Sequence, residues 1–256
     1  MALPFIRSFP LAIFISFPYN NTMKNLALDY LNKDYCLNID MIELLKRDEC
    51  LLVDADDHYV ILSDRHQYTY LVSSDSDEGY RRFLELQLSP ELLVIHQERG
   101  LALLMEPLQM MIDMTCYNAY YPFQAVTEAA TPLTFKPLKS SDLAIVTAHY
   151  KSTSPEYLEE RLHLGKIQGG YLDNSLVGFI GEHEEGSMGM LEIFESYRKK
   201  GFATAFVRHA IKHYLDRGQV PYSQIEISNQ PSIALHHKLQ MNLSASFVYW
   251  CSRRKD

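Results

Sequence analysis

The stretch Tyr197-Arg198-Lys199-Lys200-Gly201-Phe202-Ala203 decides how the rest of the sequence is interpreted. It follows an apolar run, 190–194, that is typical of a β-strand, and it precedes a run with helical periodicity. A strand–loop–helix junction directs several backbone N–H groups to one point, where the helix dipole adds positive potential. Gly201 would let a ligand approach the backbone closely. The stretch therefore predicts a pyrophosphate site, although a basic glycine turn can also serve only as a helix cap.

The residues after this stretch predict a helix, a strand and a second helix. Apolar side chains recur at helical spacing from 203 to 214, and Gly218 is a typical stop signal. The run 224–227 predicts a short strand, and Asn229 is placed to cap the next helix. The chain therefore continues as α-β-α beyond the basic loop.

Three segments resemble motifs of the GNAT superfamily of N-acyltransferases. The spacing Arg-x-x-Gly-x-Ala at 198–203 is similar to its acyl-CoA pyrophosphate loop. Residues 225–239 resemble its closing strand–Asn–helix motif, although His236 stands where the family often has tyrosine. Residues 183–192 resemble a bacterial subgroup related to glycine N-acyltransferases. The three segments follow one another in the order that the family uses.

The resemblance implies an α+β fold with a mixed, mostly antiparallel sheet flanked by helices. Residues 131–256 are expected to form the GNAT acyltransferase domain, and residues 23–130 a smaller α+β N-terminal domain. The best candidate boundary lies within 121–132, and residues 1–22 form an N-terminal extension. No internal repeat stands out in the sequence.

The resemblance also implies acetyl-CoA as a co-substrate and assigns residues to it. The backbone of Ile193 and Phe194 would pair with the pantetheine arm, and Asn229 would bond the arm from the other side. The pyrophosphate would be anchored by residues of the basic loop and the first helical turn, namely Arg198, Lys199, Lys200, Gly201, Phe202, Ala203 and Thr204.

Acyl transfer needs a base, because an alkylamine with a pKa of about 10.4 is almost fully protonated at neutral pH. The family's glutamate base falls at Ser187, which cannot act as a base unaided. Glu185 and Glu192 are therefore the candidate bases, with His183 and Ser187 as candidate substrate contacts. The non-catalytic alternatives are that Glu185 lies in a solvated turn and that Glu192 is a structural carboxylate.

His236 is the candidate catalytic residue at the position of the family's tyrosine. An imidazole with a pKa of about 6.5 could protonate the departing thiolate of coenzyme A. The alternative is a half-buried histidine on a helix surface, beside His237.

The predicted function is direct acetyl transfer from acetyl-CoA to the amine of a small molecule or amino acid, without a metal. Because Ser187 and His236 depart from the family pattern, a non-catalytic acyl-CoA-binding sensor or interaction module is the alternative. Peptide or protein N-acetylation is a weaker third possibility that no sequence feature selects.

Composition limits the partners and the compartment. The 256 residues carry a net charge of −8, which disfavours nonspecific nucleic-acid binding. No apolar run is long enough to span a membrane, and the four cysteines show no metal-ligand spacing. A cytoplasmic monomer or homodimer, with no nucleic-acid or membrane partner, is expected.

Overall fold

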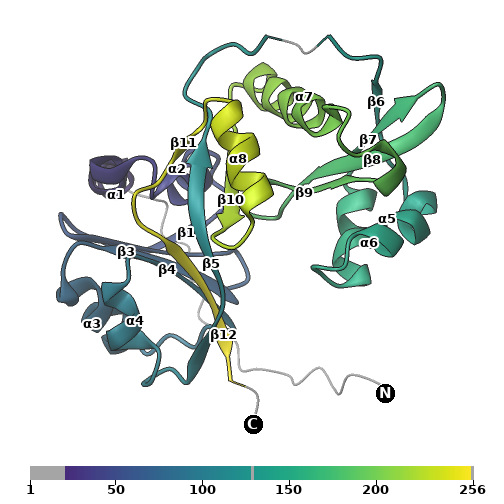
Figure 1. Ribbon diagram of the computed structural model, residues 1–256. Helices are drawn as coiled ribbons and strands as arrows, with labels where there is room; N and C mark the ends of the chain where they lie inside the picture. The colour runs from purple at the N-terminus through teal and green to yellow at the C-terminus, as the bar shows by residue number, and fades with distance from the viewer. Residues whose placement is uncertain (1–20, 128–129, 255–256) are drawn as a thin grey trace.

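The computed structural model describes residues 21–127 and 130–254, and these residues form two β-sheets flanked by helices (Figure 1). Within the described residues, one sheet has eight strands and the other has four. All strand pairs but one are antiparallel in these sheets. The predicted α+β fold with a mixed, mostly antiparallel sheet is therefore confirmed.

The first half of the chain runs from helix α1 to the long strand β5. Its elements are α1 (Asn21–Leu31), η1 (Asn32–Asp34), α2 (Ile39–Lys46), β1 (Leu51–Ala55), β2 (Tyr59–Ser63), β3 (Thr69–Ser74), α3 (Asp77–Glu85), β4 (Leu92–His96), α4 (Arg99–Leu104) and β5 (Met110–Tyr120). The antiparallel strands β1 to β3 agree with the alternation in the sequence, whereas α4 and β5 were not predicted.

The second half contains the predicted strand–loop–helix junction. Its elements are β6 (Thr134–Pro137), η2 (Ser140–Asp142), α5 (Leu143–His149), α6 (Pro155–His163), β7 (Ile167–Leu172), β8 (Ser175–Glu182), β9 (Met188–Ile193), η3 (Glu195–Tyr197), α7 (Phe202–Asp216), β10 (Tyr222–Glu226), α8 (Gln230–Lys238), β11 (Asn242–Leu243) and β12 (Val248–Arg253). The turn between β7 and β8 has Asp173 and Asn174 at positive φ, which a tight two-residue hairpin turn requires.

The order of elements repeats between the halves. In the described chain, each half presents two α-helices, then a strand trio, a helix, a strand, a helix and a final strand, with β6 and β11 added in the second half. The sequence showed no such repeat because the two halves share the order of elements rather than their residues.

The two halves exchange their final strands. Strand β12, at the C-terminal end, lies between β4 and β5 and is antiparallel to both. Strand β5 of the first half in turn pairs with β10 of the second half. Figure 1 shows β5 and β12 running together through the middle of the molecule. The two halves share this sheet. That residues 23–130 and 131–256 are separate domains, each able to fold by itself, therefore stays a prediction.

The halves differ at one pair of strands. In the first half, β3 and β4 form a parallel ladder from Thr69–Leu92 to Ser73–His96. The corresponding strands β9 and β10 form no ladder with each other among the described residues. The second half therefore leaves a gap in its sheet at the point where the basic loop begins.

Helix α7 holds one wall of this gap in place. Its buried residues, which include Phe206, Ile211 and Tyr214, belong to the core of the second half. The helix ends before Gly218, whose φ of 69° fits the predicted glycine stop. The helical periodicity in the sequence thus placed the element correctly.

The predicted extension, 1–22, lies outside the described residues except for Asn21 and Thr22, which begin α1. None of the described helices combines the length and the apolar character that crossing a membrane would require.

Candidate active site

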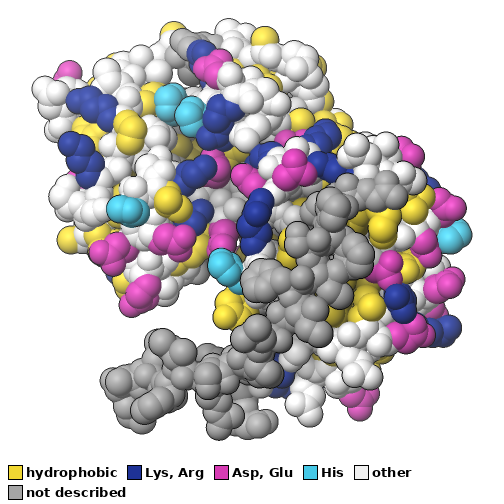
Figure 2. Space-filling model, turned by 180° about the vertical axis from the view of Figure 1, so that it is seen from behind, with side chains coloured by type: hydrophobic (Ala, Val, Ile, Leu, Met, Phe, Trp, Pro, Cys, Tyr) yellow, Lys and Arg dark blue, Asp and Glu magenta, His cyan; other side chains and the backbone are white. Residues whose placement is uncertain are grey.

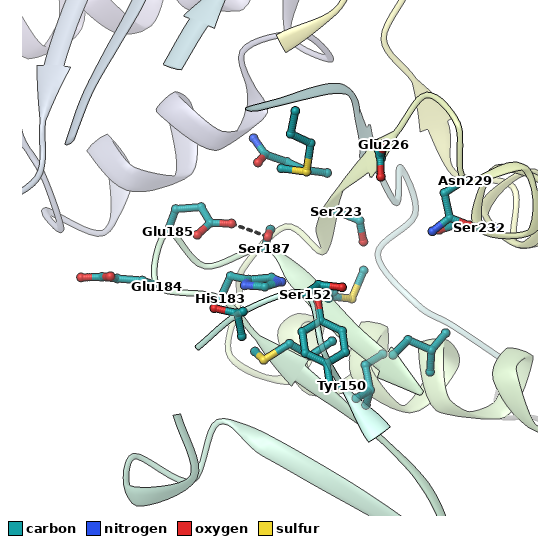
Figure 3. A pocket seen from close by; sticks show the side chains of 18 of the residues that line it. Tyr150, Ser152, His183, Glu184, Glu185, Ser187, Ser223, Glu226, Asn229 and Ser232 are labelled. Atoms are coloured by element: carbon teal, nitrogen blue, oxygen red, sulfur yellow. Dashed lines mark hydrogen bonds between the residues drawn. The ribbon is translucent and has the colours of Figure 1, made fainter. Parts of the chain in front are cut away.

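A cavity of about 1090 Å³ lies where β9 and β10 separate (Figure 3). The second half lines it with β9, the start of α7, β10 and α8, and the first half adds residues such as Asp64 and Leu92. Trp250 of the exchanged strand β12 also lines the cavity. Seen from behind, charged side chains of both signs gather where the molecule is hollowed between its two lobes (Figure 2). The site is therefore built by both halves.

Strand β9 carries a β-bulge in its ladder with β8. Met190 has a φ of 50°, and the register to β8 shifts there by one residue. Phe194 donates its N–H to the carbonyl of Val177 in β8, so the peptide groups of Ile193 point away from β8. The structure thus places Ile193 at the cavity, whereas Phe194 is buried beside it and stacks on His149.

The basic loop has the backbone of an anion-binding turn. Lys199 and Gly201 are in the left-handed region, with φ of 62° and 81°, and Gly201 is the residue before α7. The first N–H groups of a helix lack acceptors within the helix, so those of Phe202 and Ala203 are available to a ligand. Left-handed turns before a helix form concavities that favour anions.

The side chains of the predicted pyrophosphate loop have different positions. Arg198, Ala203 and Thr204 line the cavity, whereas Phe202 is buried in the core. The exposed Lys199, Lys200 and Gly201 lie at the solvent side of the loop, and Lys200 sits over the Tyr197 ring at 5.3 Å.

Glu192 is held by the loop that follows it. Arg198 donates from Nη2 to Glu192 Oε1 at 2.7 Å and from Nε to the carbonyl of Ile193 at 2.8 Å. Because a carboxylate oxygen of Glu192 is already engaged by a guanidinium, the geometry favours an anchoring role over a base role. Glu185, the other candidate base, is therefore better placed to accept a proton.

Glu185 forms a hydrogen-bonded pair with Ser187 inside the cavity. Ser187 Oγ donates to Glu185 Oε1 at 2.5 Å, and Ser187 is only 1% exposed (Figure 3). Glu184 extends away from this pair in the same view. Ser187, which stands at the family's glutamate position, therefore orients the carboxylate of Glu185, two residues earlier in the chain.

Three side chains hold the turn that carries this pair. Arg47 Nη2 donates to the carbonyl of Glu185 at 2.8 Å, and the Tyr222 hydroxyl donates to the same oxygen. Tyr214 donates to the carbonyl of Gly186 at 2.8 Å. Burial raises the pKa of both tyrosines well above the usual value, which keeps them neutral donors. Sequence reasoning missed Arg47, because it lies on α2 in the other half.

Gly186 is required where Arg47 packs. Its φ is 93°, and a Cβ at this position would lie 2.3 Å from two guanidinium nitrogens of Arg47. The guanidinium therefore lies directly against the backbone of the turn. No spacing in the sequence could have signalled this contact between residues so far apart in the chain.

His183 is held by Tyr157. The Tyr157 hydroxyl accepts the N–H of Glu184 at 3.1 Å and forms a second hydrogen bond with His183 Nδ1, at 3.1 Å. Both side chains line the cavity. Tyr157 was not predicted, and it gives His183 a fixed orientation at the cavity wall.

Tyr150 is another cavity residue that sequence reasoning missed. Burial raises the pKa of its hydroxyl, and the negative charges of Glu185 and Glu192 raise it further, so the group stays protonated. It follows helix α5 in a connection whose polar residues carry no recognisable motif.

His236 is a buried, neutral imidazole. Its Nδ1 lies 2.8 Å from the carbonyl oxygen of Ser232, so Nδ1 must carry the proton. Burial, the largest influence, lowers the pKa of the ring. Among the described residues Nε2 has no hydrogen-bond partner, although it is buried. The ring therefore presents an acceptor, and the predicted donor role requires that Nε2 first collects a proton.

Asn229 caps α8 as predicted. Its Oδ1 accepts the N–H of Ser232 at 3.1 Å, which leaves the amide Nδ2 as its group for a ligand. Asn229 lines the cavity together with Ser232 and His236. The cap therefore also faces the expected place of the pantetheine arm.

Carboxylates dominate the part of the cavity away from the basic loop. They are Glu49, Asp64, Glu184, Glu185 and Glu226, and the cations Arg65 and Lys238 also line the cavity. At least one of these carboxylates is compensated, because Glu49 pairs with Arg47 at 2.8 Å. The cavity thus combines a basic end with an acidic end.

Comparison with known proteins gives a family match to part of the chain and several structural matches. Residues 163–250 match the model of the FR47-like protein family. No curated protein sequence matches the chain significantly.

Several solved structures have the same fold. A Drosophila protein has a TM-score of 0.60 at 13% identity, covering 91% of this chain and 96% of its own. A GCN5-related N-acetyltransferase-like protein from Streptococcus suis has a TM-score of 0.52 at 14% identity, covering 89% of this chain and 100% of its own. A GCN5-related N-acetyltransferase from Kribbella flavida has a TM-score of 0.53 at 12% identity, covering 86% and 96%.

These likenesses support the GNAT superfamily, whereas the subgroup related to glycine N-acyltransferases stays a prediction. The chain has the fold of the GCN5-related N-acetyltransferases, and its FR47-like segment covers the gap between β9 and β10.

Proposed function

We propose that this protein is an acyl-CoA-dependent N-acyltransferase that transfers an acetyl group from acetyl-CoA to the amine of a small molecule. One observation carries the proposal. The gap between β9 and β10 leads from a basic, left-handed loop at Gly201 to the hydrogen-bonded pair Glu185–Ser187 within one cavity. An anion site and a proton acceptor thus share the same space.

The residues present fit a coenzyme A thioester. The N–H groups at the start of α7 and the side chain of Arg198 would hold the pyrophosphate. The N–H of Ile193, whose carbonyl already accepts from Arg198, and the amide of Asn229 would hold the pantetheine arm from opposite sides of the gap. The bulge at Met190 supports this arrangement, because it removes β9 from regular pairing next to the site.

Glu185 is the proposed base. An ammonium acceptor must lose a proton before its nitrogen can attack, and a positioned base contributes about 10²–10⁴-fold to such a step. Ser187 orients the carboxylate, while Arg47, Tyr214 and Tyr222 fix the turn that carries it. Attack then proceeds directly, with no covalent acyl-enzyme.

The acceptor side supports a small, cationic amine. Carboxylates such as Asp64 and Glu226 line this part, and an acidic cavity concentrates a positively charged substrate. Because the first half supplies part of the wall, the acceptor would be enclosed rather than bound on an open surface.

A non-catalytic acyl-CoA sensor is the second candidate. The serine at 187 and the histidine at 236 favour it, because the family's usual acid and base are replaced at both positions. If acetyl-CoA binds but no amine in a broad panel releases the thiol of coenzyme A, the protein is a sensor and not a transferase.

Titration calorimetry with acetyl-CoA tests the binding step. We expect Gly201→Asp to abolish measurable binding, because it adds a negative charge at the anion site and a side chain at a φ of 81°. Gly218→Asp is the matched control, since Gly218 has a φ of 69° at the opposite end of the same helix. The control should lose similar thermal stability but bind normally, and normal binding by Gly201→Asp would falsify the proposal.

A further inference from the structure

The strands of the shared sheet give the cavity an apolar wall that the proposed chemistry does not use. It consists of Leu92 of β4, Met114 of β5 and Trp250 of β12, which all line the cavity. The three lie on one face of the sheet, because Trp250 pairs with Met114 on one side and with Val94, two residues after Leu92, on the other. Leu92 is 37% and Met114 36% exposed, so large apolar side chains remain uncovered within the cavity.

Trp250 adds no free polar group to this apolar wall. Its indole N–H donates to Gln224 Oε1 at 2.7 Å, and Gln224 Nε2 donates to Asp40 Oδ2 at 3.2 Å. Asp40 is fully buried and also forms hydrogen bonds with His96 and Asn118. Because the single polar atom of the Trp250 side chain is satisfied within the protein, the indole offers a ligand only its ring surface, in an orientation that hydrogen bonds fix.

Strand β10 connects the apolar wall to the turn that carries Glu185. Tyr222 donates its hydroxyl proton to the carbonyl of Glu185, and Gln224, which holds Trp250, follows two residues later on the same face of β10. Two residues of a strand span about 7 Å. Adjacent side chains of one strand therefore hold the turn of the proposed base and the apolar wall, at a separation that a small acceptor can bridge.

Carboxylates lie at the same end of the cavity as the apolar wall. Glu226 follows Gln224 by two residues on β10, and Asp64 comes from the connection between β2 and β3. Ligand pockets combine apolar surface, which a ligand covers, with a few polar groups, which fix its orientation. A ligand that matches this end therefore carries a positive group and an apolar body together.

Resting on the proposed acyl transfer, we propose that the acceptor is a primary amine on an apolar body, an aryl or branched alkyl group that lies against the apolar wall. The wall belongs to β4, β5 and β12, whereas β9, α7 and α8 carry the residues assigned to the coenzyme, so the wall serves the acceptor rather than the acyl chain. The amine nitrogen forms the amide bond, and the C–S bond breaks with its electron pair on sulfur. Of the two protons that the ammonium group loses, one ends on sulfur and one passes to solvent.

Three amines of equal size separate the effect of the apolar wall from that of the charges. They are 3-methylbutylamine, β-alaninamide, which has a similar branched shape with a polar end, and 1,4-diaminobutane, which has a second charge. Thiol release from acetyl-CoA by the full chain gives kcat/KM for each amine. We expect 3-methylbutylamine to exceed β-alaninamide by about sixtyfold, because the two differ in three carbon-sized groups and each buried apolar group contributes about fourfold.

Met114→Gln tests the apolar wall itself, because glutamine has nearly the length of methionine but is polar. The preference for 3-methylbutylamine should fall to about tenfold or less, while the KM for acetyl-CoA stays unchanged. Met111→Gln is the matched control, since Met111 is an exposed methionine of the same strand that is not among the described residues lining the cavity. Trp250 is the single tryptophan of the chain, so its fluorescence should respond to 3-methylbutylamine and not to β-alaninamide.

Equal rates for the three amines, a preference for 1,4-diaminobutane, or a preference that Met114→Gln leaves intact would overturn the inference while the transferase stands. The same holds if hexanoyl-CoA is used better than acetyl-CoA and Met114→Gln removes that gain, because the apolar wall would then hold the acyl chain. If acetyl-CoA binds but none of the three amines releases thiol, the acceptor class is wrong, and the broad amine panel decides about the transferase. If acetyl-CoA does not bind, the proposed function itself fails, and the acceptor class fails with it.

Discussion

The strand pair β3/β4 of the first half and the pair β9/β10 of the second half occupy the same place in a repeated order of elements, yet one is closed and the other open. The central residues of β3 and β4 are apolar and buried, as in strands covered on both faces. Strand β9 has its bulge at Met190, and β10 carries Ser223, Gln224 and Glu226. Side-chain polarity and one bulge therefore distinguish the paired strands β3 and β4 from the open strands β9 and β10, where we propose the ligand site.

The helices that follow β3 and β9, α3 and α7, differ in the charges at their first turns. Helix α3 starts with Asp77 and Glu78, whose charges already compensate the positive end of the helix dipole. Helix α7 starts after Arg198, Lys199 and Lys200, and its first turn contains no acidic residue. A phosphate would be repelled at α3 and attracted at α7. The comparison predicts one coenzyme site per chain, in the second half.

The largest expected effect concerns the base. Glu185→Gln should lower kcat for acetyl transfer by about 10²–10⁴-fold, because the amide cannot accept the ammonium proton. Thiol release from acetyl-CoA with an accepted amine measures this, with binding of acetyl-CoA unchanged. Glu78→Gln, a carboxylate loss in the first half, is the control and should retain full activity. A normal kcat for Glu185→Gln would show that Glu185 is not the base.

The next effect tests the charge difference between the helix starts. Lys199→Glu with Lys200→Glu should weaken acetyl-CoA binding by about a hundredfold, which equals about 2.7 kcal/mol. The converse double variant, Asp77→Lys with Glu78→Lys, should create no second site, because β3 and β4 stay paired. Calorimetric stoichiometry decides both, and a second bound coenzyme would break the comparison.

A smaller effect is expected from the contact between the halves. Arg47→Ala should lower kcat about tenfold, equal to about 1.4 kcal/mol, and leave the KM for acetyl-CoA unchanged, because Arg47 donates to the turn that carries Glu185. Arg47→Lys should recover part of the loss, and Arg81→Ala, an exposed arginine on α3, should have no effect. An equal rise in KM for acetyl-CoA would show that the whole sheet has moved instead.

The smallest effect concerns the stability of the second half, through the ion pairs of Glu182. Glu182 pairs with Lys166 at 2.6 Å and Arg217 at 2.9 Å. Burial, the largest single influence, raises the pKa of this carboxyl, but the hydrogen bonds and charges of Lys166 and Arg217 together outweigh it, so the pKa lies below the usual 4.5. The stabilisation is therefore present above pH 4.5 and is lost as the pH falls through the folded-state pKa.

Glu182→Gln should accordingly lower Tm at pH 7 by about 2–4 °C if the loss is about 1 kcal/mol. The difference from the parent protein should shrink as the pH falls below 4.5. Glu159→Gln, an exposed carboxylate on α6, is the control for general charge effects. A difference that persists unchanged at low pH would contradict the ion-pair explanation.

Local sequence accounted for the parts of the site that local forces form. Gly201 before α7, the stop at Gly218 and the cap at Asn229 depend on residues within one helical turn, and all three were predicted from the sequence. Strand β5 was not predicted, because its pairing with β12 joins residues more than a hundred positions apart. The roles of the site residues remain proposals.

The sequence by itself determined the basic glycine loop, through periodicity and turn chemistry, and its resemblance to the GNAT motifs implied the α+β class and the candidate carboxylates. Only the tertiary structure gave a reason to propose Glu185 rather than Glu192 as the base, because Arg198 engages Glu192 and Ser187 orients Glu185. It also decided the tautomer of His236 and the contact of Arg47 with the turn. Which atoms face each other across the exchanged strands depends on packing between distant segments, and short-range patterns carry no information about such packing.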